Sequence, residues 1–432
     1  MTQTAFHSLG LSQDMLATLS KRGYETPTNI QQQLIPMVLN ESDDLIAQAA
    51  TGTGKTGAFG IPLIDQMDES IRQVQALAIA PTRELATQVA KELRQFAKGK
   101  KIQVIELCGG LGMRDQIQEL KSVSKATIAV GTPGRILDHL NKKRLKPNQI
   151  GYFVIDEVDE MLNFGFKEDM DQIVAYLPKD RRTIVLSATF PKFVMNVAKA
   201  YLSTYKMVNA IAGKTEKPDI AEQYYRIKKI SKFQLLCRVM DAMSGFYGFI
   251  FCNTKREVDE LAEKLLKSGY PVESMHGDLS QAQRNRALDR FKSKQCQILV
   301  VTDVAARGID VKQISHVINF AVPQNLEAYT HRIGRTGRAG QSGVAITFVT
   351  DNQMGKFKRL LQKRSISQVS IPNPKDIIKL KKDGFIQQIK DTTAKPFYLD
   401  LATDILNDLS AEEALASVLQ LRCYDIFNKR QY

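Results

Sequence analysis

A glycine-rich segment near the N-terminus has the residues that bind phosphate groups. Ala49–Thr56 reads Ala-Ala-Thr-Gly-Thr-Gly-Lys-Thr and follows a short apolar run, Leu45–Gln48. Its glycines permit a tight turn in which backbone N–H groups surround phosphate oxygens. Lys55 adds a positive charge, and Thr56 offers a hydroxyl to Mg²⁺. The segment predicts a nucleoside triphosphate site formed by Thr51, Gly52, Thr53, Gly54, Lys55 and Thr56.

Carboxylates follow another apolar run. Asp156–Asp159 reads Asp-Glu-Val-Asp and comes directly after Tyr152–Ile155. In a parallel α/β sheet, the residues that follow the strands meet in a crevice at the carboxyl edge. Asp156 is then placed to hold Mg²⁺ together with Thr56, and Glu157 is placed to orient and deprotonate a water. The loop and the carboxylates together predict ATP hydrolysis with Mg²⁺.

The elements that must position these groups form two series of short apolar runs, separated by stretches of helical periodicity. Strands that alternate with helices are typical of βαβ units, so each series predicts a parallel sheet. The first series comprises 45–48, 76–80, 102–107, 127–130, 152–155 and 183–186, and the second comprises 247–251, 297–301, 316–320 and 344–349. We therefore expect two α/β domains, at residues 1–211 and 221–355, joined by a polar linker at 212–220.

The composition limits the class of protein. Of the 432 residues, 43% are hydrophobic and 25% are charged, which indicates folded domains and not a disordered chain. No apolar run approaches the ~20 residues that span a membrane, and the N-terminus lacks a signal-peptide pattern. The five cysteines are widely separated and form no C-x-x-C pair, which argues against disulfides and zinc and favours the cytoplasm. A net charge of +14 fits a nucleic-acid partner or simple solubility.

The distribution of charged residues changes in residues 356–432. Residues 356–395 carry eleven Lys or Arg against three Asp or Glu, whereas residues 396–421 carry five acidic residues and no basic one. Ser410 and Glu413 have the spacing of a capping box, which predicts a helix that starts at Ala411. We expect a short, mainly helical extension that is basic first and acidic afterwards.

The motifs along the chain resemble those of the DEAD-box RNA helicase family, from Phe6 to Arg338. The segment His331–Arg338 matches the family's final motif residue for residue. The other matching segments are 23–31, 81–86, 109–110, 132–135, 156–159, 187–189, 251–254, 281–284, 302–303 and 306–310. The resemblance implies an ATP-dependent RNA helicase with two tandem RecA-like domains that unwinds or remodels RNA locally.

The resemblance also assigns roles to individual residues. The nucleotide is contacted by Phe6, Tyr24, Gln31 and Asp310 in addition to the phosphate loop. The arginines of the hydrolytic site are Arg335 and Arg338, which act with Lys55, Asp156 and Glu157. The RNA contacts, which are largely independent of sequence, are Pro81, Thr82, Arg83, Gly109, Gly110, Thr132, Pro133, Gly134, Arg135, Thr254, Gln281, Arg284 and Thr302. Hydrolysis is coupled to strand separation by Asp159, Ser187, Thr189 and His331.

One position departs from the family. The third residue of the acidic motif is Ala in the family and Val158 here. The three carboxylates remain, and a β-branched residue suits the end of a strand, so we expect the chemistry to survive.

Three alternatives stay open from the sequence alone. An ATP-dependent RNA clamp with little turnover would use the same motifs. Another P-loop NTPase, such as a DNA helicase, fits less well because segments 23–31 and 331–338 argue against it.

The extension at residues 356–432 resembles the post-core region of bacterial cold-shock members of the family, which implies a homodimerisation segment. Its apolar face, formed by Leu415, Val418 and Leu419, would alternatively pack against the second domain.

Overall fold

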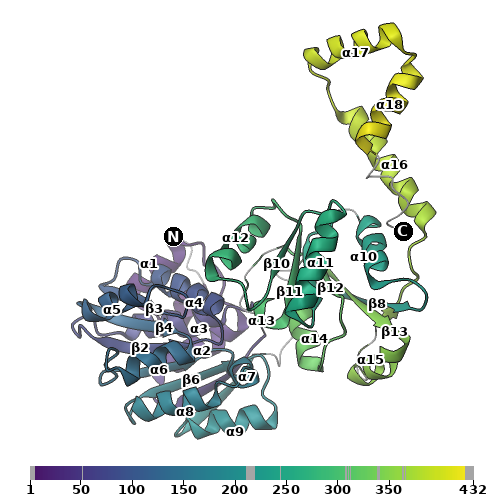
Figure 1. Cartoon of the computed structure of the whole chain (residues 1–432). Coiled ribbons are helices and arrows are strands. Elements are labelled where there is room, and N and C mark those ends of the chain that lie inside the picture. Colours follow the sequence, from purple (N-terminus) through teal and green to yellow (C-terminus); the bar gives the residue numbers. More distant parts are fainter. Residues whose placement is uncertain are drawn as a thin grey trace. The chain divides into compact units, whose positions relative to one another are not determined.

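Two compact units make up the chain, and the division between them falls after Lys217 (Figure 1). The computed structural model describes residues 5–50, 52–210, 219–243, 245–306, 309, 311, 313–337, 341–361, 364 and 366–423. Asp310, Arg338 and Thr51 lie outside these residues, as does most of the stretch expected as a linker. Among the described residues, every helix is too short or too polar to cross a bilayer.

The first unit surrounds one sheet with helices. Its strands are β1 (Asp44–Gln48), β2 (Val74–Ile79), β3 (Ile102–Leu107), β4 (Ala126–Gly131), β5 (Tyr152–Ile155), β6 (Arg182–Ser187) and β7 (Tyr205–Asn209). Its helices are η1 (Ala5–Leu9), α1 (Gln13–Lys21), α2 (Asn29–Asn40), α3 (Lys55–Gln66), α4 (Arg83–Phe96), α5 (Met113–Lys121), α6 (Pro133–Asn141), α7 (Val158–Asn163), α8 (Lys167–Tyr176) and α9 (Lys192–Ala200).

The second unit has the same architecture and carries the extension. Its strands are β8 (Ile220–Ile227), β9 (Gly248–Cys252), β10 (Val272–Met275), β11 (Ile298–Thr302), β12 (His316–Asn319), β13 (Gly343–Thr350) and β14 (Ser367–Gln368). Its helices are α10 (Lys232–Asp241), α11 (Lys255–Lys267), α12 (Gln281–Lys292), α13 (Asp303–Ala306), α14 (Leu326–Ile333), η2 (Asp351–Gln353) and α15 (Met354–Leu360). The extension contains α16 (Pro374–Asp391), α17 (Pro396–Asp408) and α18 (Ala411–Cys423).

The two sheets share one topology. Within the described residues the first sheet has the order β3-β4-β2-β5-β6-β1-β7, and the second has the order β10-β11-β9-β12-β13-β8-β14. Each number in the second order exceeds its counterpart in the first by seven, and all paired strands are parallel. The predicted α/β class with two parallel sheets is confirmed, and the shared strand order shows that the units are structural repeats.

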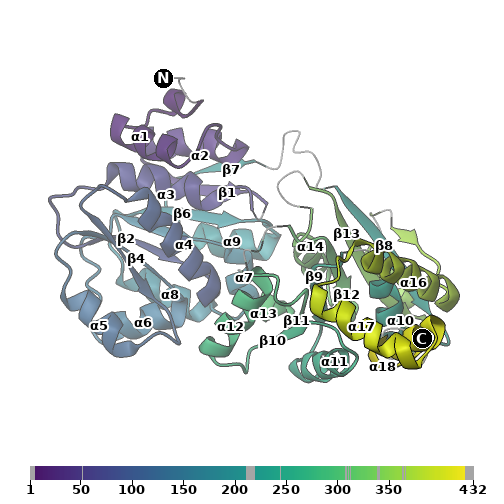
Figure 2. The same ribbon diagram turned by 90° about the horizontal axis from the view of Figure 1, so that it is seen from above.

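Burial on both faces explains why the central strands read as continuous apolar runs. All residues of β2, β4 and β6 are buried. Successive residues enter the two apolar cores in turn: Leu45 and Ala47 of β1 lie in one core, and Ile46 lies in the other. Such strands are typical of a sheet covered by helices on each face, and Figures 1 and 2 show helices above and below each sheet.

Strands β7, β8, β10 and β14 were not predicted. Four of the five residues of β7 are exposed, and β14 has two residues, both exposed, so neither gives an apolar signal. β10 has four residues and includes Glu273 and Ser274. These strands lie at or near the sheet edges, where burial on both faces is lost.

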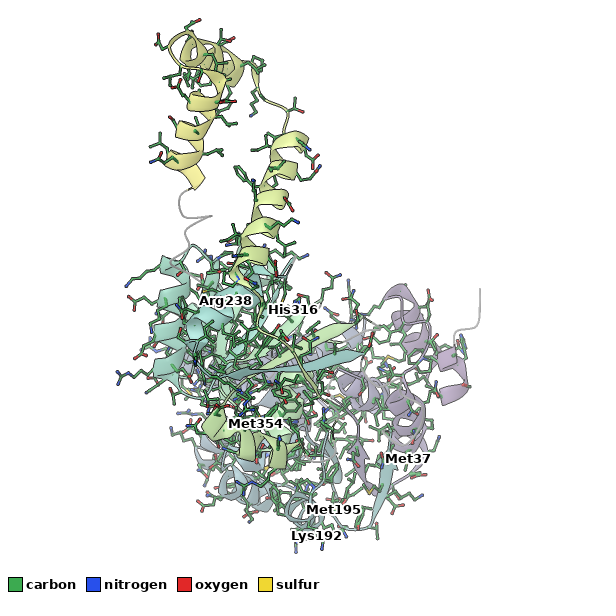
Figure 3. All side chains as sticks on the ribbon, turned by 90° about the vertical axis from the view of Figure 1, so that its right-hand side faces the viewer. Met37, Lys192, Met195, Arg238, His316 and Met354 are labelled. Carbon is green, nitrogen blue, oxygen red and sulfur yellow. The ribbon has the colours of Figure 1, made fainter. Side chains whose placement is uncertain are left out.

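The extension begins on the second unit and then turns outward. Near the start of α16, Ile377 is buried, and Lys381 Nζ lies 2.8 Å from Asp241 Oδ2 of α10. The predicted start of α18 is confirmed, because Ser410 N–H donates to Glu413 Oε2 and Glu413 N–H donates to Ser410 Oγ. Helix α18 follows α17 at an angle (Figure 1), and Figure 3 shows their side chains standing out around the ribbon.

Arg182 ties the sheet of the first unit to helix α2. Its guanidinium donates hydrogen bonds to the carbonyls of Met37 (2.9 Å), Val38 (2.6 Å) and Asp43 (2.9 Å). Two of these acceptors lie in the last turn of α2, where the helix leaves carbonyls unpaired and favours a cation.

Replacing Arg182 with Met is expected to lower the free energy of unfolding of the first unit by about 3 kcal/mol, because three carbonyls lose a charged donor. Urea denaturation measures this loss. The exposed Lys179→Met serves as a control and should change stability by less than about 0.5 kcal/mol. A loss below about 1 kcal/mol in Arg182→Met would show that water replaces the guanidinium.

Candidate active site and nucleic-acid interface

The phosphate loop, the acidic segment and residues 187–189 follow three neighbouring strands. The loop follows β1, the carboxylates follow β5, and Ser187 ends β6, which pairs with both. Residues that are more than a hundred positions apart in sequence therefore meet at one edge of the sheet. This half of the first sheet carries the predicted ATP chemistry.

The phosphate loop has the backbone that its glycines predict. Gly52 and Gly54 have φ of 77° and 85°, which are left-handed values that other residues rarely adopt. Thr53 Oγ1 donates to the carbonyl of Ala50 at 2.8 Å, which closes the turn. Lys55 and Thr56 open α3, so the first N–H groups of that helix face the loop. Such a helix start binds anionic phosphate oxygens.

Two buried charged groups in this half each have an atom without a hydrogen-bond partner among the described residues. Lys55 Nζ and one carboxylate oxygen of Asp156 are buried without a hydrogen bond among the described residues. Burial raises the pKa of Asp156 to about 6, while the nearby Lys55 opposes the shift. Unpaired buried charges are costly, so both groups are suited to a ligand that supplies phosphate oxygens and a divalent cation. Thr56 adds a hydroxyl, and the set fits Mg²⁺ bound with a nucleotide.

Glu157 has an unusual backbone. It lies between β5 and α7 with φ 55° and ψ 54°, and its side chain is buried. A non-glycine residue in this left-handed region costs about 1–3 kcal/mol, and such strain is concentrated at functional sites. The conformation directs a carboxylate into the same half as Asp156.

A hydrogen-bonded pair joins the acidic segment to the end of β6. Asp159 Oδ2 accepts from the N–H of Thr189 at 3.1 Å and from its Oγ1 at 2.8 Å. Ser187 Oγ donates to the carbonyl of Thr189 at 2.7 Å. Val158 is fully buried in an apolar core, so its side chain packs against other apolar residues and not against solvent. Two hydrogen bonds therefore connect the acidic segment to residues 187–189.

Of the residues expected to recognise adenine, Gln31 contacts the phosphate loop and Tyr24 packs against Phe6. Gln31 Nε2 donates to the carbonyl of Gly54 at 3.2 Å, and Gln31 Oε1 accepts from the N–H of Thr28 at 2.9 Å. Tyr24 is partly exposed and meets the ring of Phe6 edge-on, with ring centroids 6.2 Å apart. Phe6 has no exposed surface and packs against Tyr24, and its expected contact with the nucleotide stays a prediction.

The other half of the first sheet carries the predicted RNA contacts. Pro81 to Arg83 follow β2, Gly109 and Gly110 follow β3, and Thr132 to Arg135 follow β4, and these strands are adjacent. Thr82 Oγ1 caps α4 by accepting from Leu85 N–H. A Cβ on Gly109 would lie 2.9 Å from the Arg83 guanidinium, so glycine permits this close approach. Pro133 occupies the first turn of α6, and Gly134 is exposed beside it.

Sequence reasoning missed Gln116 of α5, which links two of these segments. Its Nε2 donates to the carbonyl of Cys108 at 2.8 Å. Its Oε1 accepts from Arg135 at 3.2 Å and from His139 Nε2 at 3.1 Å. Burial, aided by Arg135, lowers the pKa of His139 to about 4, so this histidine is neutral near pH 7. A single glutamine on a polar helix gives no sequence signal that could have identified it.

The second unit repeats the arrangement. Thr254 follows β9, Gln281 and Arg284 lie on α12 after β10, and Thr302 ends β11, and these three strands are adjacent. Thr254 and Thr302 both accept from backbone N–H groups that begin the next helix. The predicted RNA contacts of the second unit therefore occupy the positions that correspond to β3, β4 and β2 of the first.

The final motif lies on the other side of β9. His331 and Arg335 lie on and just after α14, which follows β12, and Arg335 is buried. Arg332 was not predicted to matter, yet it is 1% exposed and forms two hydrogen bonds with Asp303, at 2.5 and 2.8 Å. Its guanidinium also lies 5.2 Å from the ring centroid of Phe251. Arg332 thus fixes the base of the motif to β9 and β11.

The strain at Glu157 leads to a stability prediction. Glu157→Gly should raise the free energy of unfolding of the first unit by about 1 kcal/mol relative to Glu157→Gln, because glycine adopts the left-handed region without a steric cost. Glu157→Gln keeps the strain and should match the unchanged protein. Equal stability of the two variants in urea denaturation would show that the backbone of Glu157 is not strained.

Comparisons with known proteins match both units. Residues 28–197 match the DEAD/DEAH box helicase family, and residues 231–340 match the helicase conserved C-terminal domain. A DEAD-box ATP-dependent RNA helicase, CshA, from Geobacillus kaustophilus is 40% identical over 423 residues, which cover 97% of this chain and 90% of that protein.

Solved structures agree with this relationship. Saccharomyces cerevisiae Dbp5 bound to RNA and ADP BeF3 has a TM-score of 0.78 at 30% identity, covering 88% of this chain and 99% of that chain. A DEAD box protein from Methanococcus jannaschii has a TM-score of 0.50 at 40% identity, covering 84% of this chain and 99% of that chain. The two units are tandem RecA-like domains, and the chain is a member of the DEAD-box family of ATP-dependent RNA helicases.

Proposed function

We propose that the half of the first sheet formed by β5, β6 and β1 hydrolyses ATP with Mg²⁺, and that the half formed by β3, β4 and β2 binds the RNA backbone. The unpaired buried charges of Lys55 and Asp156 are the observation that carries the first part of this proposal. Mg²⁺, held by Asp156 and Thr56, would neutralise charge on the phosphates when bound.

The protein residues then have separate tasks. Lys55 and the N–H groups at the start of α3 hold the phosphates. Glu157 orients the attacking water and takes its proton, which the strained backbone of this residue supports. Gln31 exchanges its bond to the Gly54 carbonyl for the adenine edge, because an amide offers both a donor and an acceptor.

Hydrolysis also requires residues of the second unit. By resemblance, Arg335 and Arg338 act as arginine fingers and Asp310 contacts the ribose, so the two units must close around ATP. RNA that bridges both units favours the same closure, and the two ligands then bind cooperatively and reciprocally. The Asp159–Thr189 pair and His331 carry the change between the ATP half and the RNA half. Local strand separation follows when a closed RNA surface bends one strand.

The experiment that tests the proposed base is Glu157→Gln. This variant should lose RNA-stimulated ATP turnover by at least about a thousandfold, because glutamine cannot accept the proton of water. ATP-dependent RNA binding should remain, because the phosphate loop and the RNA half are unchanged. Steady-state phosphate release and RNA binding with ATP measure the two properties.

A matched control is Glu160→Gln, which removes a neighbouring buried carboxylate outside the proposed chemistry and should retain turnover within about tenfold. Persistent turnover in Glu157→Gln would show that another group is the base. Wild-type protein that binds RNA with ATP but neither hydrolyses ATP nor separates a short duplex would support the clamp alternative.

For the extension, we propose a homodimer formed through α17 and α18. Large apolar side chains on these helices are exposed, including Phe397 (70%), Leu415 (56%) and Leu421 (82%). In the alternative, Leu415, Val418 and Leu419 pack against the second unit, and the monomer mass of the unchanged chain would favour it. An apolar surface of this kind is typical of an interaction site.

The location of the protein in the cytoplasm, which its widely spaced cysteines favour, is a separate proposal.

Light scattering tests the dimer. The full chain should have about twice the 48.5 kDa mass of the monomer, and Leu415→Glu combined with Val418→Glu should return it to the monomer mass because charges enter an apolar interface. The exposed Gln420→Glu on the same helix should stay dimeric. A monomer at micromolar concentration for the unchanged chain would refute the proposal.

A further inference from the structure

The first unit has a basic hollow at the edge of the sheet opposite the helicase motifs. A cavity of about 470 Å³ opens where β2 begins, at Arg72 to Val74. Its walls come from the end of α5 and from the segment after α6. The motif residues follow the carboxyl ends of β2 and β4. From Val74 to Ile79 the strand rises about 16 Å, so the hollow is separate from the motif face.

The rim of the hollow is positively charged. Five of its ten lining residues are basic and none is acidic: Arg72, Lys121, Lys143, Arg144 and Lys146. Arg144 lies 3.6 Å from Asp138, so its charge is partly used within the protein. For the other four, no carboxylate of the described residues lies within 4 Å of the charged group. The hollow thus presents unneutralised positive charge to solvent.

Four of the ten lining residues are aliphatic, and we call these four the floor of the hollow. Val74, Ile117, Leu120 and Val123 supply aliphatic side chains between the cations. An inorganic anion gains nothing from such a floor, whereas a nucleotide offers a flat base to the aliphatic side chains and a phosphate to the rim. The cavity volume is within the range of small-ligand sites, which is about 300–1,000 Å³.

Local backbone geometry is a second, independent observation. Lys143 occupies the position after the C-cap of α6 with φ 54°, where glycine or asparagine is preferred. Lys294 has the same kind of position after α12, and there its ammonium lies 5.9 Å from the ring centroid of Tyr247. No such partner is present for Lys143 among the described residues. Lys143 therefore has a left-handed backbone, and its ammonium group has no carboxylate or aromatic ring beside it among the described residues.

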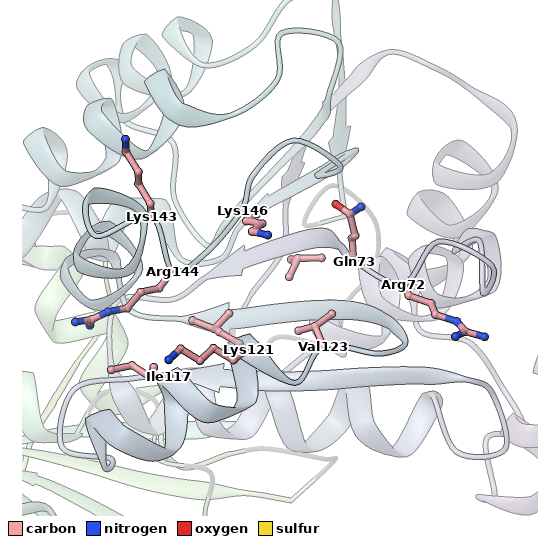
Figure 4. Close-up of a pocket in the computed structure, with 10 residues that line it drawn as sticks. Arg72, Gln73, Ile117, Lys121, Val123, Lys143, Arg144 and Lys146 are labelled. Carbon is pink, nitrogen blue, oxygen red and sulfur yellow. The ribbon is translucent and has the colours of Figure 1, made fainter.

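Part of this charge also has a structural use. Lys121 is the last residue of α5, where a cation stabilises the helix dipole. Arg72 and Lys146 end no helix, so that explanation does not cover them. Figure 4 shows Arg72 and Lys143 at opposite ends of the hollow, with Lys121 and Lys146 between them. Cations at both ends and in the middle of the hollow can contact more than one phosphate, and a nucleic-acid strand supplies several phosphates whereas a compact anion supplies one.

We propose that this hollow is a second RNA subsite, which seats one nucleotide on the apolar floor and holds the adjoining phosphates on the basic rim. The RNA that it binds extends beyond the segment held by the helicase motifs. The hollow lengthens the footprint of the first unit and anchors substrate while the motif contacts open and close. The proposal does not require the individual motif contacts proposed above, because none of the lining residues is one of those contacts.

The test compares single-stranded RNAs of about eight and about thirty nucleotides, since the short RNA fills the motif face only. Lys121→Glu combined with Lys146→Glu should weaken binding of the long RNA about tenfold and reduce the salt slope by about 1.4, because two phosphate contacts are lost. Its affinity for the short RNA should change less than about twofold. The pair Lys98→Glu and Lys179→Glu, exposed on the same unit outside the hollow, is the matched control.

A second variant separates a built site from diffuse charge. Val123→Trp fills the floor and keeps every cation, and it should also weaken the long RNA selectively, with thermal melting as the check on folding. Equal losses in the two lysine pairs, or no loss in Val123→Trp, would overturn the proposal in favour of a merely basic surface. Equal weakening of the short RNA would overturn the separate subsite.

Crosslinking distinguishes RNA from a free nucleotide as the occupant. A thirty-nucleotide RNA with 4-thiouridine should crosslink to peptides containing Lys121 or Lys146 in the full chain, and the crosslink should disappear in the double variant. Free AMP and pyrophosphate at millimolar concentration should compete poorly. Strong competition by AMP would overturn the proposal, because the hollow would then be a site for a free nucleotide.

Discussion

In a parallel sheet, the chain must cross over the sheet between one strand and the next, so all strands point the same way. This constraint brings the segments that follow the strands to the same edge of the sheet. The loops that follow the strands emerge at one edge of each sheet, so their order in space is the strand order and not the chain order. In the first unit, that order puts the segments of the proposed nucleotide site after β5, β6 and β1, and the segments proposed to bind RNA after β3, β4 and β2. The second unit repeats the order, so its proposed RNA contacts follow the corresponding strands.

Within each half, hydrogen bonds hold the loops in a fixed relation. Gln31 joins the N-terminal motif to the phosphate loop, and Gln116 joins the loop after β3 to Arg135. The Asp159–Thr189 pair links the carboxylates to residues 187–189. Two unpaired buried charges and a strained Glu157 remain at the nucleotide half. These features lower the stability of the protein without nucleotide, and a bound nucleotide with Mg²⁺ would supply the missing contacts. Such local strain is common at functional sites.

The sequence predicted the parts of this structure that depend on local pattern. Strands buried on both faces were found, because they are short apolar runs between helical segments, and the capping box placed the start of α18. Edge strands such as β7 escaped, because exposure removes the apolar signal. The left-handed backbone of Glu157, the burial of Arg332 and the contact between Phe6 and Tyr24 depend on tertiary packing, which no spacing reveals. Resemblance supplied the RNA assignment, since 2′-hydroxyl contacts have no sequence signature.

The central claim is that the Asp159–Thr189 pair carries the nucleotide state to RNA binding. The most direct measurement is RNA affinity with and without a non-hydrolysable ATP analogue, for the unchanged chain and for Thr189→Val, which removes the 2.8 Å bond and keeps the volume. The account predicts that the gain in RNA affinity caused by the analogue falls by about tenfold, while RNA binding without the analogue stays the same. An undiminished gain in Thr189→Val would contradict it.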